Sequence, residues 1–371
     1  MQRFRLALLG ALLLGPLCPG AALAAPSLSV DWRQPIEKLA PMAWKPRLWA
    51  APSLSADGQR VYCPSGAGLS VLSAASGKPL WELQGGDAIQ GTPVERDGTV
   101  YLVTAGGTVH ALDGRSGKPV WAKPRQLDAV SHADPTVGKR HVYVMSDPGL
   151  LTAIDRRTGV IGWRYGHGVA REFLIEGHGA ATLRDQVVYA GLSDGRLVAL
   201  AARDGGLVWE QHLGDSRKGP YTDCDSTPVI ARIGAQTAVL AAAHNTGLFA
   251  HEAANGGQLW RYDCAGLGQP VVSGGRVYAI SGDSALHVVD VTNGKRVFAR
   301  QLAGEPSGRI AVAGPWLVVP GGAGIQVIDA SNGHGLSRII DEFGFAAAPL
   351  RVGRRLFAVS NGGIAWSLRL R

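Results

Sequence analysis

A repeat of about 40 residues constrains the fold of this chain more than any other feature. Two copies show it clearly, VYLVTAGGTVHALDGRSGKPVW from Val100 to Trp121 and VYVMSDPGLLTAIDRRTGVIGW from Val142 to Trp163. The other copies begin at Val61, Val188, Val239, Val277, Leu317 and Leu356, so that successive copies start 38 to 51 residues apart. A period of this length, built from short β segments and turns, is typical of propellers and solenoids.

Each copy contains four short strands separated by turns. In the second copy the strands are Thr92-Pro93-Val94, Val100 to Val103, Val109 to Leu112, and a last one that reaches Trp121. Four short strands in succession form a meander, which is the unit of a propeller blade.

The eighth copy ends at Arg371 without a final strand. Near the other end of the chain, Ser29 to Arg33 alternates like a strand and includes Trp32, but no strands of its own precede it. Pairing this segment with the C-terminal strand would close a ring and remove two open sheet edges. We therefore expect residues 25–371 to form one all-β domain, an eight-bladed propeller of four-stranded antiparallel blades.

The recurring polar and aromatic residues are best interpreted as parts of the scaffold. Asp113, Asp155, Asp290 and Asp329 each precede a turn glycine by four residues, where a carboxylate accepts backbone hydrogen bonds and glycine supplies a positive φ. In the first six copies an aromatic residue follows the turn glycine by four residues and should pack between neighbouring blades. These aromatic positions are Trp81, Trp121, Trp163, Trp209, Trp260 and Phe298, with Trp32 on the closing strand and Ser337 in the seventh copy.

The first 24 residues have the features of a signal peptide. Arg3 and Arg5 precede twelve apolar residues, and Ala22-Leu23-Ala24 matches a small-x-small cleavage site. We expect a soluble periplasmic protein without a transmembrane segment. A lipid anchor at Cys18 is not expected, because Leu17 stands where lipidation needs a small residue.

The net charge narrows the classes of molecule that this protein could bind. The net charge of +8 falls to +6 once Arg3 and Arg5 are removed, and the cations are scattered, so nucleic acid is not an expected partner. A weak preference for anionic surfaces is compatible with this positive net charge.

The three cysteines after residue 24 have different expected roles. Cys63 lies in a strand and is expected to be buried. Cys224 and Cys264 occupy corresponding loops of neighbouring repeats and are candidates for a disulfide in an oxidising compartment.

The VY, ALD, TGK and W elements of the repeat resemble the pyrroloquinoline-quinone (PQQ) type of propeller repeat. Within that group, two stretches resemble the BamB family of outer-membrane protein assembly factors. They are FLIEGHGAA from Phe173 to Ala181 and DCDSTPV from Asp223 to Val229, which follows the long loop Leu213 to Thr222.

This resemblance implies a non-catalytic scaffold that docks onto other envelope proteins, in particular a BamA-like barrel assembly protein. The contact residues would be Phe173, Leu174, Ile175, Glu176, Asp223 and Asp225. Glu176 departs from the family, which has arginine there, and so reverses the charge offered to a partner. In the alternative interpretation, Phe173 to Ile175 pack between blades, while Asp223 and Asp225 cap the backbone of the long loop.

Two other functions are compatible with a propeller of this repeat type, a PQQ-dependent oxidoreductase and a small-molecule or PQQ-binding protein. A PQQ-dependent oxidoreductase shares the repeat, but such enzymes resemble each other in having two adjacent cysteines over the quinone, and this sequence has no adjacent pair. A small-molecule or PQQ-binding protein is the alternative that this leaves open, while no cofactor and no metal are expected. His132 and His178 with Asp134 would be the metal ligands if a site existed, but hydrogen bonds to loop carbonyls are the preferred explanation of these histidines.

Overall fold

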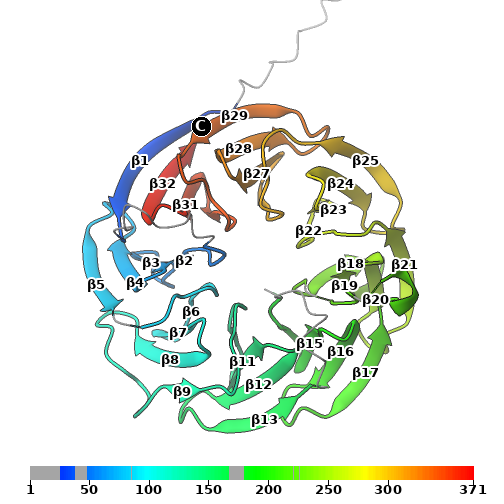
Figure 1. Ribbon diagram of the computed structural model, residues 1–371, viewed down its shortest axis with the longest axis horizontal. Coiled ribbons are helices and arrows are strands. Elements are labelled where there is room, and N and C mark those ends of the chain that lie inside the picture. Colours follow the sequence, from blue (N-terminus) through cyan, green and yellow to red (C-terminus); the bar gives the residue numbers. More distant parts are fainter. Residues whose placement is uncertain (1–25, 38–47, 85, 167–178, 220, 225) are drawn as a thin grey trace, which may run out of the picture.

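The computed structural model describes residues 26–37, 48–84, 86–166, 179–219, 221–224 and 226–371. The strands form eight antiparallel sheets of four strands each, arranged as blades around a central axis (Figure 1). The predicted eight-bladed propeller is therefore confirmed.

Blades 1 to 4 follow each other along the chain, and each runs from the inner to the outer strand. Blade 1 contains β2 (Ser53–Leu54), β3 (Arg60–Ser65), β4 (Gly68–Ser73) and β5 (Pro79–Gln84). Blade 2 contains β6 (Val94–Arg96), β7 (Thr99–Val103), β8 (Thr108–Asp113) and β9 (Arg125–Gln126). Blade 3 contains β10 (Thr136–Val137), β11 (His141–Ser146), β12 (Leu150–Asp155) and β13 (Ile161–Tyr165). Blade 4 contains β14 (Thr182–Arg184), β15 (Val187–Gly191), β16 (Arg196–Ala201) and β17 (Leu207–His212).

Blades 5 to 8 repeat the arrangement, and the last one uses both ends of the chain. Blade 5 contains β18 (Val229–Ile233), β19 (Gln236–Ala243), β20 (Gly247–Glu252) and β21 (Gln258–Asp263). Blade 6 contains β22 (Val271–Ser273), β23 (Arg276–Ile280), β24 (Ala285–Asp290) and β25 (Arg296–Gln301). Blade 7 contains β26 (Ala311–Ala313), β27 (Trp316–Gly321), β28 (Gly324–Asp329) and β29 (Gly335–Ile340). Blade 8 contains β30 (Leu350–Val352), β31 (Arg355–Val359), β32 (Ile364–Leu370) and β1 (Leu28–Pro35).

The core of the protein lies between neighbouring blades. The second and third strands of a blade are buried on both faces, as in β11, where every residue from His141 to Ser146 is buried. Outer strands alternate between exposed and half-buried residues, as in β5. One cluster shows the arrangement, because Leu151 and Ala153 of blade 3 pack with Val188 and Leu200 of blade 4. Apolar burial thus holds each blade to its neighbours.

Blade 8 closes the ring as predicted. β1 pairs with β32 from Leu28 opposite Leu370 to Pro35 opposite Ile364, with a bulge between Val30 and Trp32. The pairing continues past the strands, because Ser27 and Arg371 exchange two backbone hydrogen bonds of 3.1 and 2.9 Å. The closing strand is therefore bonded along its whole length.

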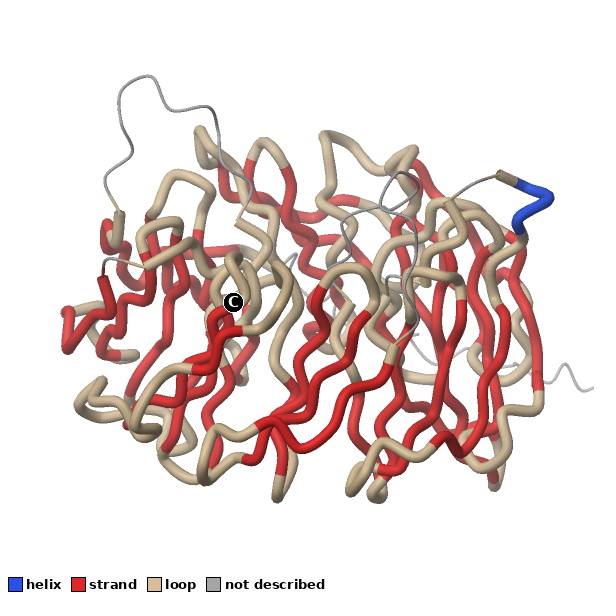
Figure 2. Tube along the Cα trace, turned by 60° about the horizontal axis from the view of Figure 1, so that its bottom comes forward, coloured by secondary structure: helices blue, strands red, loops and turns tan. Residues whose placement is uncertain are grey.

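The alternating strand directions give the ring two different faces. The turns after the first strands of all blades and after the third strands of blades 1 to 7 lie at one end, which we call the turn face. The turns after the second strands and the connections between blades lie at the other end, the loop face. The single 3-10 turn among the described residues, Ser216–Lys218, belongs to the connection after β17 and stands at the upper edge of Figure 2.

The outer strand of blade 2 differs from the expectation. It pairs with β8 at Arg125 and Gln126, after Trp121, whereas the sequence predicted a last strand that reaches Trp121. Pro119 and Pro124 lack the amide hydrogen that a continuous ladder needs, and only an isolated bridge joins Pro119 to Leu112. Pro79 begins β5 at the position that corresponds to Pro119, so Pro124 is the proline that sets this strand apart.

Candidate functional site

The aspartates of the third turns are occupied by their own turns. Asp113 accepts hydrogen bonds from the amide and hydroxyl of Ser116, at 2.8 and 2.7 Å, and Gly117 adopts a φ of 70°. The hydroxyl bond, followed by the amide bond, lowers the pKa of Asp113 below its usual range. Asp290 and Asp329 are held in the same way by Thr292 and Ser331. These carboxylates form turns, as the sequence predicted.

Each tryptophan of the repeat lies against the third turn of the following blade. A Cβ atom added to Gly159 would lie only 2.8 Å from Cδ2 of Trp121, so the ring rests directly on the glycine backbone. The other pairs are Trp32 with Gly77, Trp81 with Gly117, Trp163 with Gly205, Trp209 with Gly256 and Trp260 with Gly294. The turn glycine is therefore needed both for its positive φ and for the close approach of the ring.

The indole also bonds to the turn that it covers. Trp121 donates from Nε1 to the carbonyl of Arg156 at 2.9 Å, and the five other tryptophans make the equivalent bond at 2.9 to 3.4 Å. In blade 3 the hydroxyl of Tyr143 donates to the same carbonyl as Trp163, that of Ala202, at 2.9 Å. The VY tyrosine and the tryptophan thus share one role, which is to bond the next blade.

The seventh blade has Ser337 where the other blades have an aromatic residue after the third turn, and the eighth blade lacks a third turn. At Gly333 of blade 7, an added Cβ would lie 2.9 Å from Cδ of Arg300 and 3.4 Å from Cε2 of Phe298, so the aliphatic part of Arg300 shares this position with the phenyl ring. Ser337 of blade 7 would face the connection between β32 and β1, but these strands come from opposite ends of the chain. Without a turn glycine to cover, a tryptophan there would have no equivalent partner. This set of aromatic positions belongs to the scaffold and leaves the loops as the place for a binding site.

Most of the predicted docking residues lie outside the described residues. Phe173, Leu174, Ile175 and Glu176 fall in 167–178, and Asp225 is also outside. Asp223 is described and its side chain is completely buried. A buried carboxylate cannot touch a docked protein, so Asp223 is not a contact residue, and its backbone carbonyl instead accepts a hydrogen bond from His244 at 2.8 Å. This corrects the role expected for Asp223 from the resemblance.

The long loop Leu213 to Thr222 is fixed to the neighbouring blade. Asn245, in the second turn of blade 5, donates to the carbonyl of Asp215 at 2.8 Å and accepts from its amide at 3.2 Å. Thr246 donates to the carbonyl of Leu213 at 2.8 Å. These bonds hold the loop on the loop face, against the second turn of blade 5.

This loop presents residues that the sequence reading did not single out. The Arg217 side chain is 88% exposed and pairs with Asp215, and its hydrogen bond lowers the pKa of Asp215 to about 2. Tyr221 is 44% exposed, and its ring meets His244 edge-on at 6.5 Å. The only sequence signal was the spacing of 51 residues between Val188 and Val239.

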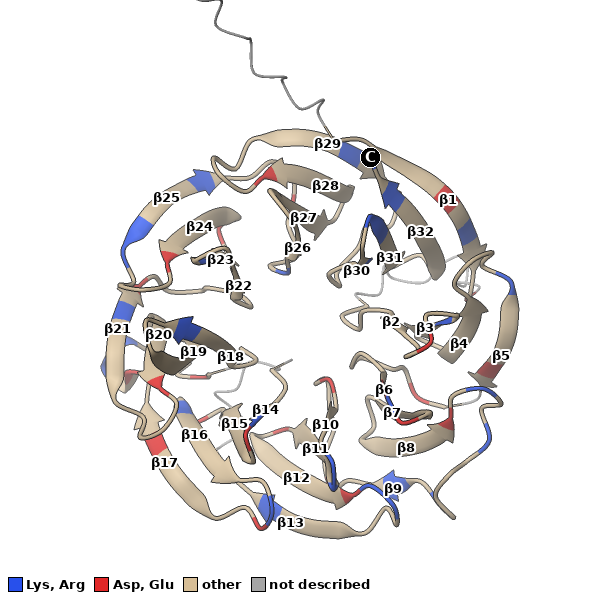
Figure 3. Ribbon diagram, turned by 180° about the vertical axis from the view of Figure 1, so that it is seen from behind, with Lys and Arg blue, Asp and Glu red and all other residues tan. Residues whose placement is uncertain are grey.

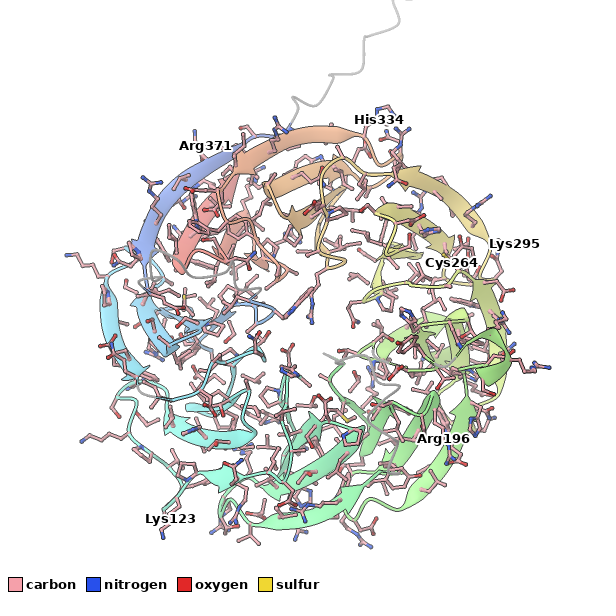
Figure 4. All side chains as sticks on the ribbon, viewed as in Figure 1. Lys123, Arg196, Cys264, Lys295, His334 and Arg371 are labelled. Carbon is pink, nitrogen blue, oxygen red and sulfur yellow. The ribbon has the colours of Figure 1, made fainter. Side chains whose placement is uncertain are left out.

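The structure does not contain the predicted disulfide between Cys224 and Cys264. Cys264 is a half-buried free thiol on the blade 5 to blade 6 connection (Figure 4), with Sγ 3.7 Å from Nε2 of His287. Cys224 is buried in a different cluster, against Leu213 and Tyr189. The two side chains thus pack at different blade interfaces. Cys63 is buried, as expected, and burial raises the pKa of its thiol.

The candidate metal ligands His132, His178 and Asp134 are not brought together among the described residues. Asp134 accepts a hydrogen bond from the amide of Thr92 in the preceding blade at 2.5 Å, so it links two blades. His132 lies with Nδ1 3.7 Å from Oδ2 of Asp147. His178 is outside the described residues. No group of three His, Cys, Asp or Glu side chains within the described ranges could hold a metal ion.

The described part of the chain also contains no helix of the length and apolarity that a bilayer span requires. The ring of eight four-stranded blades and the indole contacts define the class of this protein as a β-propeller of the PQQ-repeat type. The family profile described as outer membrane protein assembly factor BamB matches residues 21–131 and 65–300. The chain belongs to this family.

Individual relatives agree with this assignment. The protein is 22% identical to the outer membrane protein assembly factor BamB of Yersinia pestis over 336 residues, which cover 84% of this chain and 82% of the relative. It is 26% identical to BamB of Burkholderia pseudomallei over 381 residues, covering 95% and 97%. The crystal structure of BamB from Moraxella catarrhalis superposes with a TM-score of 0.79 at 19% identity, covering 92% of this chain and 99% of that one, which shows the shared fold.

Proposed function

We propose that this protein is a non-catalytic scaffold for outer membrane protein assembly in the periplasm, reached after cleavage near Ala24. The observation that carries the proposal is the family match, which extends over the two loop-bearing connections around blades 4 and 5. The relatives are named as outer membrane protein assembly factors. A propeller suits this role, because a rigid ring can present loops from one face without movement of the blades.

We assign docking to the loop face around blades 4 and 5, with a BamA-like barrel assembly protein as the partner. Phe173, Leu174 and Ile175 would supply the apolar anchors, since buried apolar and aromatic side chains at an interface centre contribute most of the binding free energy. The exposed ring of Tyr221 on the adjacent loop extends this surface. Glu176 and Asp225 are assigned to the same surface on the family resemblance.

Affinity isolation of the protein from native envelopes, followed by mass spectrometry, tests the proposal. We expect a BamA-like protein among the captured proteins, and a loss of at least about tenfold with Phe173→Ala plus Ile175→Ala, because two apolar anchors each contribute on the order of 1–2 kcal/mol. Absorbance of the purified protein is recorded in parallel, since a quinone spectrum would favour the small-molecule alternative.

The control truncates two exposed apolar side chains on the opposite face. Val120 and Val160, which are 46% and 55% exposed, lie beside third turns on the turn face. Val120→Ala plus Val160→Ala should leave capture unchanged. Equal loss in both double variants, or full capture by the loop variant, would contradict docking through the loop face.

A third variant tests the loop without touching a contact residue. Asn245→Ala removes both hydrogen bonds to Asp215, each of which stabilises the ordered loop by about 1 kcal/mol. We expect partner affinity to fall by up to about tenfold while the melting temperature of the ring stays nearly constant. An unchanged affinity would exclude the loop Leu213 to Thr222 from the docking surface.

A further inference from the structure

One histidine of blade 5 stands at a position that is aliphatic in the other blades with a third turn. His251 precedes the turn glycine Gly256 by five residues and is only 2% exposed. The six other residues at this position are all buried and apolar, namely Leu72, Leu112, Ile154, Leu200, Val289 and Ile328. An ionisable side chain thus replaces an aliphatic one in the core between blades 4 and 5.

His251 lies among aromatic rings from both of these blades. Its ring is stacked on that of Phe249, with centroids 6.2 Å apart, and is 6.4 Å from the ring of Trp209 on β17 of blade 4. Trp209 in turn rests on the backbone of Gly256. His251 therefore adjoins the contact that joins the two blades, where burial among apolar groups disfavours its charged form.

The hydrogen bonding of the imidazole fixes the place of any added proton. Nδ1 donates to the carbonyl of Gly256 at 2.8 Å, so in the neutral ring Nε2 is the nitrogen without a hydrogen. Nε2 is buried and has no hydrogen-bond partner among the residues that the structure describes. Protonation of His251 would thus leave both a positive charge and an unsatisfied donor in the interface.

The charged groups of blade 5 around His251 do not favour its protonated form. Glu252 is next to it in β20, so its side chain points to the other face of the strand, where it accepts a hydrogen bond within its own turn. Arg261 on β21 lies over the ring of Phe249 at 5.2 Å, and Arg232 on β18 is exposed. A cation close to the imidazole can only oppose its protonation.

The charged and titratable groups of blade 4 are directed away from His251 or have partners of their own. Glu210 and His212 alternate with Trp209 along β17 and so lie on the other face of that strand. The hydroxyl of Tyr189 donates to a backbone carbonyl of the third turn of blade 5 at 3.1 Å, and Asp185 pairs with the adjacent arginine at 2.7 Å.

Other titratable groups of these blades lie at the opposite end of the interface or on the rim. Asp223 and Cys224 belong to the connection on the loop face, whereas His251 adjoins the third turn on the turn face. Figure 3 shows the charged segments of β17 and β21 on the outer circumference of the ring. Burial lowers the pKa of His251, and the hydrogen bond to Gly256 acts in the opposite direction.

We propose that His251 makes the contact between blades 4 and 5 a pH-sensitive switch, which opens locally when the imidazole takes up a proton. Opening gives Nε2 access to water, where the charged form is solvated, so acid shifts the equilibrium toward the open contact. Leu213 packs in the same apolar cluster as Trp209 and Phe249. Opening of the contact therefore also loosens the start of the loop Leu213 to Thr222.

The direction and the size of the effect follow from proton binding. The open contact binds a proton near the ordinary histidine pKa of 6.5, whereas the closed contact has a lower pKa. The closed contact is therefore fully favoured above pH 6.5 and loses this advantage as the pH falls below that value. Between pH 7.5 and pH 5.0 the equilibrium constant for opening should rise by up to about 30-fold, the limit for a histidine of pKa 6.5 that does not protonate at all in the closed contact.

This inference goes beyond the proposed scaffold function, because it concerns the ring alone. It is measured on the purified protein without a partner, so its failure is distinguishable from a failure of docking.

Hydrogen exchange followed by mass spectrometry at pH 7.5 and pH 5.0 tests the proposal, after correction for the intrinsic pH dependence of exchange. Amides of β20 and of the loop Leu213 to Thr222 should lose protection in acid by up to about 30-fold. Amides of β4 in blade 1, where Leu72 takes the place of His251, should not follow them. A loss of less than about threefold in β20, or an equal loss in β4, would overturn the proposal.

The variant His251→Leu restores the residue type of the other blades and should abolish the acid response of β20. The matched control is His110→Leu, which removes a histidine whose pKa is also lowered by burial, but from β8 of blade 2. It should leave the response of β20 unchanged. Suppression by both variants alike, or by neither, would overturn the proposal.

A titration of the imidazole by NMR decides the question in the unmodified protein, even if His251→Leu folds poorly. The ring of His251 should stay neutral as the pH falls below 6.5, while exposed histidines become charged. A pKa at or above 6.5, which cation–π attraction to Trp209 and Phe249 would produce, would overturn the proposal.

Discussion

Replacing Gly159 by alanine should destabilise the protein much more than the same replacement at Gly98. Both glycines adopt a positive φ, 71° and 78°, so both substitutions force an alanine into the left-handed region at a cost of about 1–2 kcal/mol. The added methyl group has nothing within 4 Å at Gly98, but at Gly159 it would lie 2.8 Å from the ring of Trp121. Gly98→Ala therefore measures the backbone strain alone.

The additional cost at Gly159 comes from the indole that must move. Trp121 is only 3% exposed, so its displacement disturbs a packed interface at a cost of about 1–3 kcal/mol. The hydrogen bond from Trp121 to the carbonyl of Arg156, 2.9 Å long, would be weakened as well, which adds about 1 kcal/mol. We expect a total of about 3–5 kcal/mol for Gly159→Ala and about 1–2 kcal/mol for Gly98→Ala.

Urea unfolding followed by far-UV circular dichroism measures both values. A double-mutant cycle with Trp121→Leu isolates the contact, because the smaller side chain makes room for the methyl group. We expect Gly159→Ala to cost at least about 1 kcal/mol less in the Trp121→Leu background. Equal costs at Gly98 and Gly159, or full additivity in the cycle, would refute the view that the turn glycine is needed for the approach of the ring.

Three further predictions concern single side chains. Phe298→Trp should raise stability by about 1 kcal/mol in urea unfolding, because an indole at this position can donate to the carbonyl of Ala330, and a loss would show that this interface cannot accept the larger ring. The hydrogen bond from Arg369 lowers the pKa of Asp31 below 3.8, so its contribution is complete above that pH and is lost as the pH falls through the folded-state pKa. Asp31→Asn should thus lower the melting temperature at pH 7, which corresponds to a loss of less than about 1 kcal/mol in stability. Near pH 2 the melting temperatures of the variant and the parent should converge. A difference that stays constant with pH would contradict a stabilising ion pair at Asp31. Iodoacetamide should label Cys264 in the native protein but Cys224 only after unfolding, and an unlabelled Cys264 that becomes reactive with reductant would instead support the disulfide.

The regular part of this fold could be predicted from the sequence because each blade repeats the same turn residues and the same aromatic position. The spacing from Asp113 to Gly117 to Trp121 encodes a turn and an aromatic ring that covers the corresponding turn of the following blade, and this spacing is visible in the sequence of each repeat. Ring closure was also predictable, since Ser29 to Arg33 had no partner strand and the eighth copy lacked one.

Features that depend on the neighbouring blade could not be read in this way. The burial of Asp223 depends on how the long loop is fixed by the second turn of blade 5, and no local pattern around Asp223 encodes that contact. Ser337 interrupts the aromatic pattern of the repeat. Only the closed ring shows that the following blade has no turn for an indole to cover, so the exception follows from the topology rather than from the residue.

The meeting of Ser27 and Arg371 has a geometric consequence. Because they bond to each other on the turn face, anything attached through either end of the folded ring leaves from that side. A fused tag or a tether to a surface would therefore hold the ring by its turn face, and the loops of blades 4 and 5 would point away from the attachment. Immobilisation through the termini should accordingly leave the docking loops facing solution, whereas attachment through a cysteine placed in the loop Leu213 to Thr222 should hide them.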